Sequence, residues 1–215
     1  MNFELMNNNK VTVSGEVATQ PVFSHDVLGE GFYEFDLKVK RLSDQFDIVP
    51  ITISERLVKD SQIVKGKQIA LSGQFRSYNK QIDEKSKLML TVFVREVLQD
   101  LDAVGDVNEI ILSGFVCKAP IYRTTPFNRE ICDVLIAVNR SYNKSDYLPC
   151  IAWGRNAKLV KDWHIGQSIK VQGRIQSRIY NKKLENDQTV QLTAYEISLV
   201  KIEKEDHFQH SAEGV

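Results

Sequence analysis

The chain has 215 residues, of which 42% are hydrophobic, and its 28 basic residues balance its 28 acidic residues. This length suffices for two small hydrophobic cores, and the balanced charge argues against a protein that coats nucleic acid through bulk positive charge. No apolar run approaches the roughly 20 residues of a membrane span, and the first residues lack the apolar core of a secretory signal, so we expect a soluble, cytoplasmic protein with no membrane partner.

The sequence repeats itself with an offset of 99 residues. The register holds for about forty residues and then drifts to 102, where Tyr78 aligns with Tyr180. A period of this size suits a duplicated domain and is too long for a solenoid repeat. The matched pairs include Ser14 with Ser113, Arg41 with Arg140, Asp47 with Asp146 and Pro50 with Pro149.

Taken in chain order, the first repeat is predicted over residues 1–98, with three strand segments, the helical segment SERLVKDSQIVKG and two further strands. Residues 99–107 are acidic and aperiodic, and we expect them to link the two repeats. The second repeat is predicted over residues 108–202, and the polar tail 203–215 is predicted to be disordered.

The strand signals are clearest in the second repeat, where five segments are rich in β-branched and aromatic residues. These segments are 109–117, 131–140, 146–153, 168–176 and 188–201. Between the third and fourth, a helix of two or three turns is predicted, with an apolar side and an end near Gly166. The apolar side consists of Ala157, Leu159, Val160 and Trp163.

Five strands with a helix between the third and fourth is the order of the OB-fold, a small Greek-key barrel. We therefore predict an all-β chain with one short helix per domain, built as two tandem five-stranded OB-fold barrels. A small split barrel of another type is the alternative.

Neither a metal site nor an enzyme is indicated. Cys117, Cys132 and Cys150 lack a CxxC pairing, and we interpret them as small apolar residues of strands. The sequence contains no GxSxG, GxxxxGK[ST], HExxH or paired-carboxylate motif. We expect no catalysis, no cofactor and no small-molecule substrate.

Strand alternation places aromatic residues on an outer face of the second repeat. Within the third strand we expect Leu148, Cys150 and Ala152 to fill the barrel, and Tyr147, Ile151 and Trp153 to point outward. Tyr147 and Trp153 are then about 20 Å apart, a span that suits several nucleotides of an extended strand. The alternative is that Trp153 packs under the helix or in a subunit contact.

The fourth strand alternates in the same way. Its apolar side consists of Ile169, Val171, Gly173 and Ile175. The opposite side carries Lys170, Gln172, Arg174, Gln176, Arg178 and Tyr180. A basic stripe that ends in an aromatic residue is typical of surfaces for single-stranded nucleic acid, although such a face can also be merely solvated.

Three segments together resemble the bacterial single-stranded DNA-binding protein (SSB) family over about residues 108 to 200. They are NEIILSGFVCKAPIYRTTPFNREICDVLIAVNRSY, DYLPCIAWGRNAKLV and IGQSIKVQGRIQSRIYN. The resemblance rests on A-V-N-R, A-W-G, G-x-x-I-x-V-x-G-R and R-x-Y in combination. It implies sequence-nonspecific binding and protection of single-stranded DNA in replication, repair or recombination, in the bacterial cytoplasm or nucleoid.

The resemblance also implies the site residues. Bases would stack on Tyr142, Tyr147, Trp153 and Tyr180. Phosphates would contact Arg123, Arg140, Lys144, Arg155, Arg174, Arg178 and Lys182. In the first repeat, weaker candidates are Tyr78, Arg41 and Arg76, with Phe46 and Tyr33 as further possibilities for a different surface. Of these, Phe46, Tyr33, Arg41 and Arg76 are equally compatible with a place in the core or at a solvated edge.

The first repeat departs from the family pattern at three of the four stacking positions. Ser43, Ile48 and Ser54 stand where the second repeat has Tyr142, Tyr147 and Trp153. We expect this repeat to bind DNA weakly or through other residues, and a structural or oligomerising role is the alternative.

Family members with one OB-fold per chain form tetramers, and members with two form dimers, so the resemblance implies a homodimer that presents four barrels. The ending HSAEGV lacks the acidic tip of the family's housekeeping members, which favours an accessory, phage-like, mobile-element or primosome-type role. A protein-interaction scaffold and an RNA-binding OB protein remain alternative functions, because the stacking surface accepts either sugar.

Overall fold

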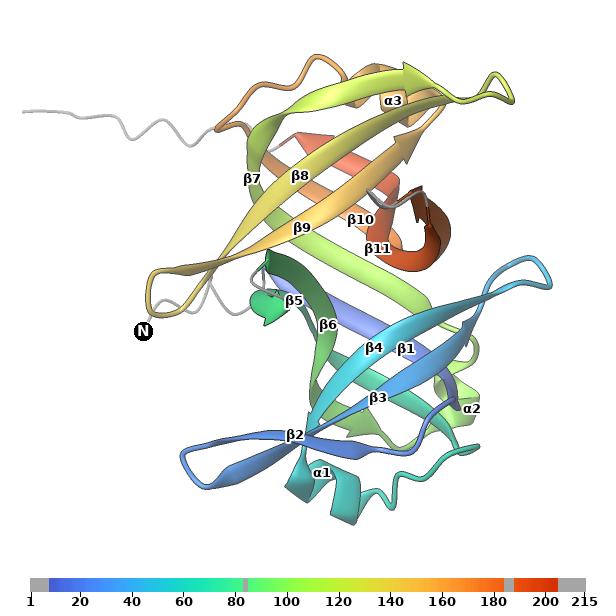
Figure 1. Cartoon of the computed structure of the whole chain (residues 1–215), viewed down its shortest axis with the longest axis vertical. Helices are drawn as coiled ribbons and strands as arrows, with labels where there is room; N and C mark the ends of the chain where they lie inside the picture. The colour runs from blue at the N-terminus through green and yellow to red at the C-terminus, as the bar shows by residue number, and fades with distance from the viewer. Residues whose placement is uncertain (1–7, 83–84, 184–187, 205–215) are drawn as a thin grey trace, which may run out of the picture.

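The computed structural model describes residues 8–82, 85–183 and 188–204. Its strands form two barrels, one above the other in Figure 1, which are joined in a single sheet of eleven strands. The tail that the sequence predicts to be disordered lies outside the described residues from residue 205 onward, and the last strand includes residues 203 and 204.

The first barrel contains six strands and one short helix. They are β1 (Asn9–Val17), β2 (Val22–Val27), β3 (Glu30–Lys40), β4 (Phe46–Ser54), α1 (Glu55–Asp60), β5 (Gln68–Ile82) and β6 (Lys85–Leu98). The sequence predicts five strands here. The sixth strand arises because the chain leaves the sheet at residues 18–21, which end in Pro21, and then resumes as the edge strand β2.

The second barrel has the predicted order of five strands with a helix between the third and fourth. It follows the short helix α2 (Leu101–Val104), which lies within the stretch predicted as a linker. The remaining elements are β7 (Asn108–Thr124), β8 (Glu130–Arg140), β9 (Lys144–Trp153), α3 (Arg155–Val160), β10 (Ser168–Lys183) and β11 (Thr189–Lys204). β10 is longer than predicted because it continues to pair with β11 as a two-stranded ribbon, out to Lys183 opposite Thr189. β11 extends three residues beyond its predicted end, to Lys204, which pairs with Ile169.

The core follows the predicted alternation. Side chains at most 3% exposed fill the barrels from β4 and β9, namely Val49, Ile51, Ile53, Leu148, Cys150 and Ala152. Ile151 was predicted to point outward, yet it is only 3% exposed and lies outside the core cluster. It is flanked in the sheet by Asp133 of β8 and Ser198 of β11, so neighbouring strands cover the middle of β9 and leave its two ends open.

The helix of the second barrel is shorter than predicted. It ends at Val160 after six residues, and the chain continues through turns to Gly166, whose φ is +85°. Ala157, Val160 and Trp163 are buried as predicted. Leu159 is 46% exposed, so its assignment to the apolar side was wrong. At about 100° per residue it lies on the side of the helix opposite the buried Ala157.

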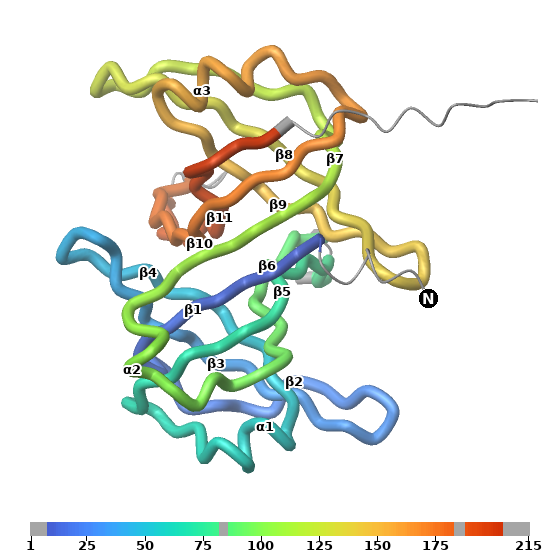
Figure 2. Tube along the Cα trace, turned by 180° about the vertical axis from the view of Figure 1, so that it is seen from behind, coloured from blue at the N-terminus to red at the C-terminus, as the bar shows by residue number. Residues whose placement is uncertain are grey.

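The two barrels are joined by an antiparallel pairing of β1 with β7, seen from behind in Figure 2. At the centre of this pairing Val11 faces Ile110. These two residues are counterparts in the 99-residue repeat. A strand that pairs with its own counterpart defines a two-fold axis, as in an isologous dimer interface. The barrels are therefore related by an approximate two-fold rotation within one chain.

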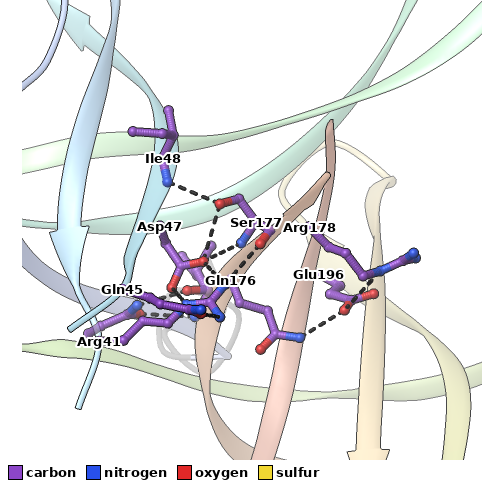
Figure 3. A network of polar contacts seen from close by, with 10 residues as sticks. Arg41, Gln45, Asp47, Ile48, Gln176, Ser177, Arg178 and Glu196 are labelled. Carbon is purple, nitrogen blue, oxygen red and sulfur yellow. Dashed lines mark hydrogen bonds and ion pairs between the residues drawn. The ribbon is translucent and has the colours of Figure 1, made fainter. Parts of the chain in front are cut away.

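Polar contacts across the junction obey the same symmetry. The backbone N–H of Ser177 donates to Asp47 Oδ1 at 2.6 Å, as Figure 3 shows. In the other half, the Ser77 N–H donates to Asp146 Oδ1 at 2.8 Å, and the Tyr147 N–H donates to Ser77 Oγ at 2.7 Å. Asp47 and Asp146 are at most 2% exposed, so each barrel positions the other through a buried carboxylate.

This symmetry corrects the alignment of the two repeats at one point. Because Ser77 and Ser177 make the same contact, the offset there is 100 residues. The structural counterpart of Tyr78 is therefore Arg178, whereas the sequence alignment matched Tyr78 with Tyr180.

No helix within the described ranges is long and apolar enough to cross a membrane.

Candidate nucleic-acid interface

All four aromatic side chains predicted to stack on bases reach the surface of the second barrel. Tyr142 is 91% exposed, Tyr147 47%, Trp153 38% and Tyr180 37%. Tyr147 and Trp153 lie near the two ends of β9, on the side opposite the core. Tyr142 lies in the turn between β8 and β9 with a φ of +63°, and Tyr180 lies on the β10–β11 ribbon.

Trp153 borders a surface hollow that also includes Arg129 and Glu130. The Tyr122 hydroxyl donates to Glu130 at 2.5 Å, and Lys158 lies 3.0 Å from the same carboxylate. Hydrogen bonding by Tyr122 and then by Lys158 lowers the pKa of Glu130, so this group stays ionised at neutral pH. Arg129 provides positive charge beside Trp153; sequence reasoning missed it because it lies in the β7–β8 loop, away from the alternating strand pattern.

Four of the predicted phosphate contacts make no ion pair within the described part of the chain. Lys144, Arg155 and Lys182 are exposed, and Arg174 is partly buried on β10. Lys144 begins β9 near Tyr142, and Arg155 follows Trp153 after one residue. These side chains are available to neutralise phosphates beside the stacking positions.

The other three predicted phosphate contacts already form ion pairs with acidic side chains of the protein. The Arg123 Nε lies 2.8 Å from Asp133, the Arg140 Nε lies 3.6 Å from Asp146, and the Arg178 Nε lies 3.8 Å from Glu196. The sequence could not show these pairings, since each joins residues on different strands. Their positive charge is partly neutralised before any ligand arrives.

The weaker candidates of the first barrel differ in their surroundings. Tyr78 is 41% exposed. Arg41 donates to both oxygens of Asp47, at 2.8 and 2.6 Å, and its Nη2 also donates to the Ser177 carbonyl at 3.0 Å. Arg41 is thereby held in the junction between the barrels. Arg76 lies over an aromatic ring at the opposite half of the junction.

The other two candidates of the first barrel, Tyr33 and Phe46, also differ in their surroundings. Tyr33 is partly buried and packs against the hydrophobic core. Phe46 is 47% exposed, and the Lys38 ammonium lies 4.3 Å from its ring centroid.

Two cysteines, Cys132 and Cys150, are buried in strands as predicted, and Cys117 is partly buried. Burial raises the pKa of the Cys132 thiol to about 11. Among the residues that the structure describes, no group of three or more His, Cys, Asp or Glu side chains could hold a metal ion.

The two linked barrels define a tandem OB-fold protein. One barrel carries exposed aromatics among basic side chains that form no ion pair with the described residues, which is the kind of surface that binds single-stranded nucleic acid. Residues 107–203 match the sequence model of the single-strand binding protein family. The match lies in the second barrel, which therefore carries the sequence pattern of this family.

Relatives agree with this assignment. Single-stranded DNA-binding protein 3 of Streptococcus agalactiae is 30% identical over 84 residues, which are 36% of this chain and 61% of that protein. Single-stranded DNA-binding protein A of Bacillus subtilis is 30% identical over 83 residues, 35% of this chain and 48% of that protein. The matched region thus spans about half to three-fifths of the relatives' length.

The wild-type single-stranded DNA binding protein from Thermus aquaticus has a similar crystal structure, with a TM-score of 0.67 and 18% identity. The likeness covers 93% of this chain and 93% of that chain. It therefore extends over both barrels and confirms the predicted fold of two tandem OB domains.

Proposed function

We propose that the protein binds single-stranded DNA without sequence preference and protects strands exposed in replication, repair or recombination. One observation carries the proposal: Tyr147 and Trp153 are both exposed on one side of β9, in the barrel that matches the family. Base–aromatic stacking contributes about 1–3 kcal/mol per base and is tolerant of sequence, because every base has a π-face. Duplex DNA hides those faces and binds more weakly.

In this proposal the mechanism has two steps and no chemical reaction. Basic side chains that have no carboxylate partner within the described residues, such as Lys144, Arg155 and Lys182, attract the strand, and the aromatic side chains then stack on its bases. The second barrel, residues 108–202, is the primary site. The first barrel, residues 1–98, is secondary, and residues 99–107 join the two.

We further propose that the protein acts as a homodimer with four barrels in the bacterial cytoplasm. The support for the dimer is the tandem arrangement, since two barrels already form a two-fold pair within the chain. RNA is the alternative ligand, because stacking and phosphate contacts are common to both nucleic acids.

The intrinsic fluorescence of the protein tests the stacking role of Trp153. The chain has two tryptophans, of which Trp153 is 38% exposed and Trp163 is 5% exposed. We expect oligo-dT to quench the emission of the wild type and of Trp163→Phe, and to leave the emission of Trp153→Phe nearly unchanged. Quenching that persists in Trp153→Phe, or no quenching in the wild type, would contradict the proposed site.

A further inference from the structure

The first barrel has a pair of arginines supported by an aromatic ring, at the junction with the second barrel. The guanidinium carbon of Arg76 lies 3.8 Å from the centroid of the Phe93 ring, and that of Arg95 lies 5.8 Å from it. Both guanidiniums donate to the side-chain oxygen of Gln74, at 3.0 and 3.3 Å. Phe32 packs against Phe93 with ring centroids 5.5 Å apart, so the Phe93 ring that supports the arginines is itself held in place by packing.

Neither guanidinium forms an ion pair with a carboxylate within the described ranges. The Nε of Arg76 is buried and has no hydrogen-bond partner there. Burial and the positive charges of Arg95 and Arg140 lower the pKa of Arg76 to about 10. Arg76 and Arg140 both interact with the buried carboxylate of Asp146, and Arg95 adds a further positive charge beside Arg76. The local surplus of positive charge attracts an anion.

The duplication provides an internal comparison. The strand pairings make Gln74 with Phe93 equivalent to Arg174 with Ser198, and Arg76 with Thr91 equivalent to Gln176 with Glu196. The second barrel therefore has no ring at this position.

Its local charge is also neutralised. As Figure 3 shows, Gln176 donates to Glu196 at 2.8 Å, and Arg178 lies 3.8 Å from the same carboxylate. The ring-supported pair is thus found in the first barrel, which also lacks aromatic counterparts of Tyr142, Tyr147 and Trp153.

The pair lies next to the stacking face of the second barrel. Arg76 precedes Ser77, whose side-chain oxygen accepts from the backbone N–H of Tyr147. Tyr147 is one of the two aromatics on β9, and its neighbour Asp146 is one of the charged groups that act on Arg76. The pair therefore lies close to one end of this face.

We propose that Arg76 and Arg95, held on Phe93, form a phosphate-binding site that receives the backbone of a single strand as it crosses from the second barrel to the first. The inference rests on the proposed function, because the phosphates are those of the bound single strand. Guanidinium groups without a carboxylate partner favour phosphate oxygens through charge-assisted hydrogen bonds. The first barrel then contributes through charge rather than through stacking.

The salt dependence of binding to short and long strands tests this site. We would titrate the full-length chain with oligo-dT of about 8 and about 30 nucleotides, because one OB-fold covers on the order of 4–16 nucleotides. The plot of log K against log salt has a negative slope, and each lost phosphate contact reduces the magnitude of that slope by about 0.7 for single strands. For Arg76→Gln/Arg95→Gln we expect a decrease of about 1.4 on the long strand and none on the short one.

Two further variants complete the test. Arg95→Gln alone, at an exposed position, avoids any folding defect caused by the half-buried Arg76, and we expect a decrease of about 0.7 on the long strand. Lys65→Gln removes one charge from an exposed loop of the same barrel and should leave both slopes unchanged.

The outcomes separate the two proposals. A long-strand slope that is unchanged in Arg95→Gln and in the double variant, while the wild type binds both strands, would overturn the junction site and leave the proposed function intact. A wild type that binds neither strand would overturn both.

Discussion

At the residue scale, Tyr147 and Ile48 occupy the same place in the two barrels and differ only in the side chain they present. The N–H of Tyr147 donates to Ser77 Oγ at 2.7 Å, and the N–H of Ile48 donates to Ser177 Oγ at 3.1 Å. The two side chains are 47% and 36% exposed. Because the backbone is held in the same way at both places, a substitution there changes the surface without changing the scaffold.

This pair gives a matched test of stacking. We expect Tyr147→Ala to weaken oligo-dT binding by about 1–3 kcal/mol, or roughly 5- to 150-fold, because one base loses its aromatic partner. Ile48→Ala should leave the affinity unchanged. Fluorescence anisotropy of labelled oligo-dT measures both, and equal losses in the two variants would show that the effect is not stacking.

At the element scale, each barrel contains a glycine at which one strand closely approaches the backbone of the strand it pairs with. A Cβ on Gly73 would lie 2.3 Å from the Phe93 carbonyl oxygen, and a Cβ on Gly173 would lie 2.5 Å from the Ser198 carbonyl oxygen. Both glycines follow a register shift in the pairing of their strands. The absence of a side chain therefore permits this close approach of the two backbones in each repeat.

The close approach at Gly73 predicts that a side chain there lowers the stability of the protein. We expect Gly73→Ala to lower the free energy of unfolding by about 1–3 kcal/mol, because a backbone oxygen cannot give way as a flexible side chain would. Ser72→Ala, at the neighbouring position of the same bulge, should change it by less than about 0.5 kcal/mol. Urea denaturation followed by circular dichroism measures both free energies. Equal stability of Gly73→Ala and the wild type would show that the close approach at Gly73 tolerates a methyl group.

Much of this element-level structure could be predicted from the sequence. Alternation of apolar residues identified the inward face of β9, because a barrel strand has one buried side. The duplication showed that both halves share one fold. The same alternation failed at Ile151, because burial there depends on two neighbouring strands, and it could not foresee the length of the β10–β11 ribbon.

The site was predicted less completely than the fold. Exposure of Tyr147 and Trp153 followed from strand parity, whereas the ion pairs of Arg123, Arg140 and Arg178 depend on contacts between distant segments. The Phe93 platform gave no signal, because a phenylalanine in a strand is most often part of the core.

At the scale of the whole molecule, the pairing of β1 with β7 makes one chain the equivalent of a two-fold dimer of barrels. This arrangement fixes the junction contacts of Asp47 and Asp146 within the chain. The two barrels therefore keep a fixed relation to each other, which in the proposed function favours a continuous path for a strand along the molecule.

A second copy of the chain would bring the number of barrels to four. We expect light scattering coupled to size exclusion to give twice the chain mass of 24.6 kDa. A mass of one chain at micromolar concentration would contradict the homodimer, while leaving the binding site of the single chain unaffected.

The measurement that tests the central claim most directly is fluorescence anisotropy of labelled oligo-dT, oligo-rU and matched duplex DNA at low and high salt. We predict tight binding of oligo-dT, much weaker binding of duplex, and a steep loss of affinity with salt as counterions are released. Comparable binding of oligo-rU would extend the ligand to RNA. Failure to bind oligo-dT at low salt, or a preference for duplex, would contradict the account.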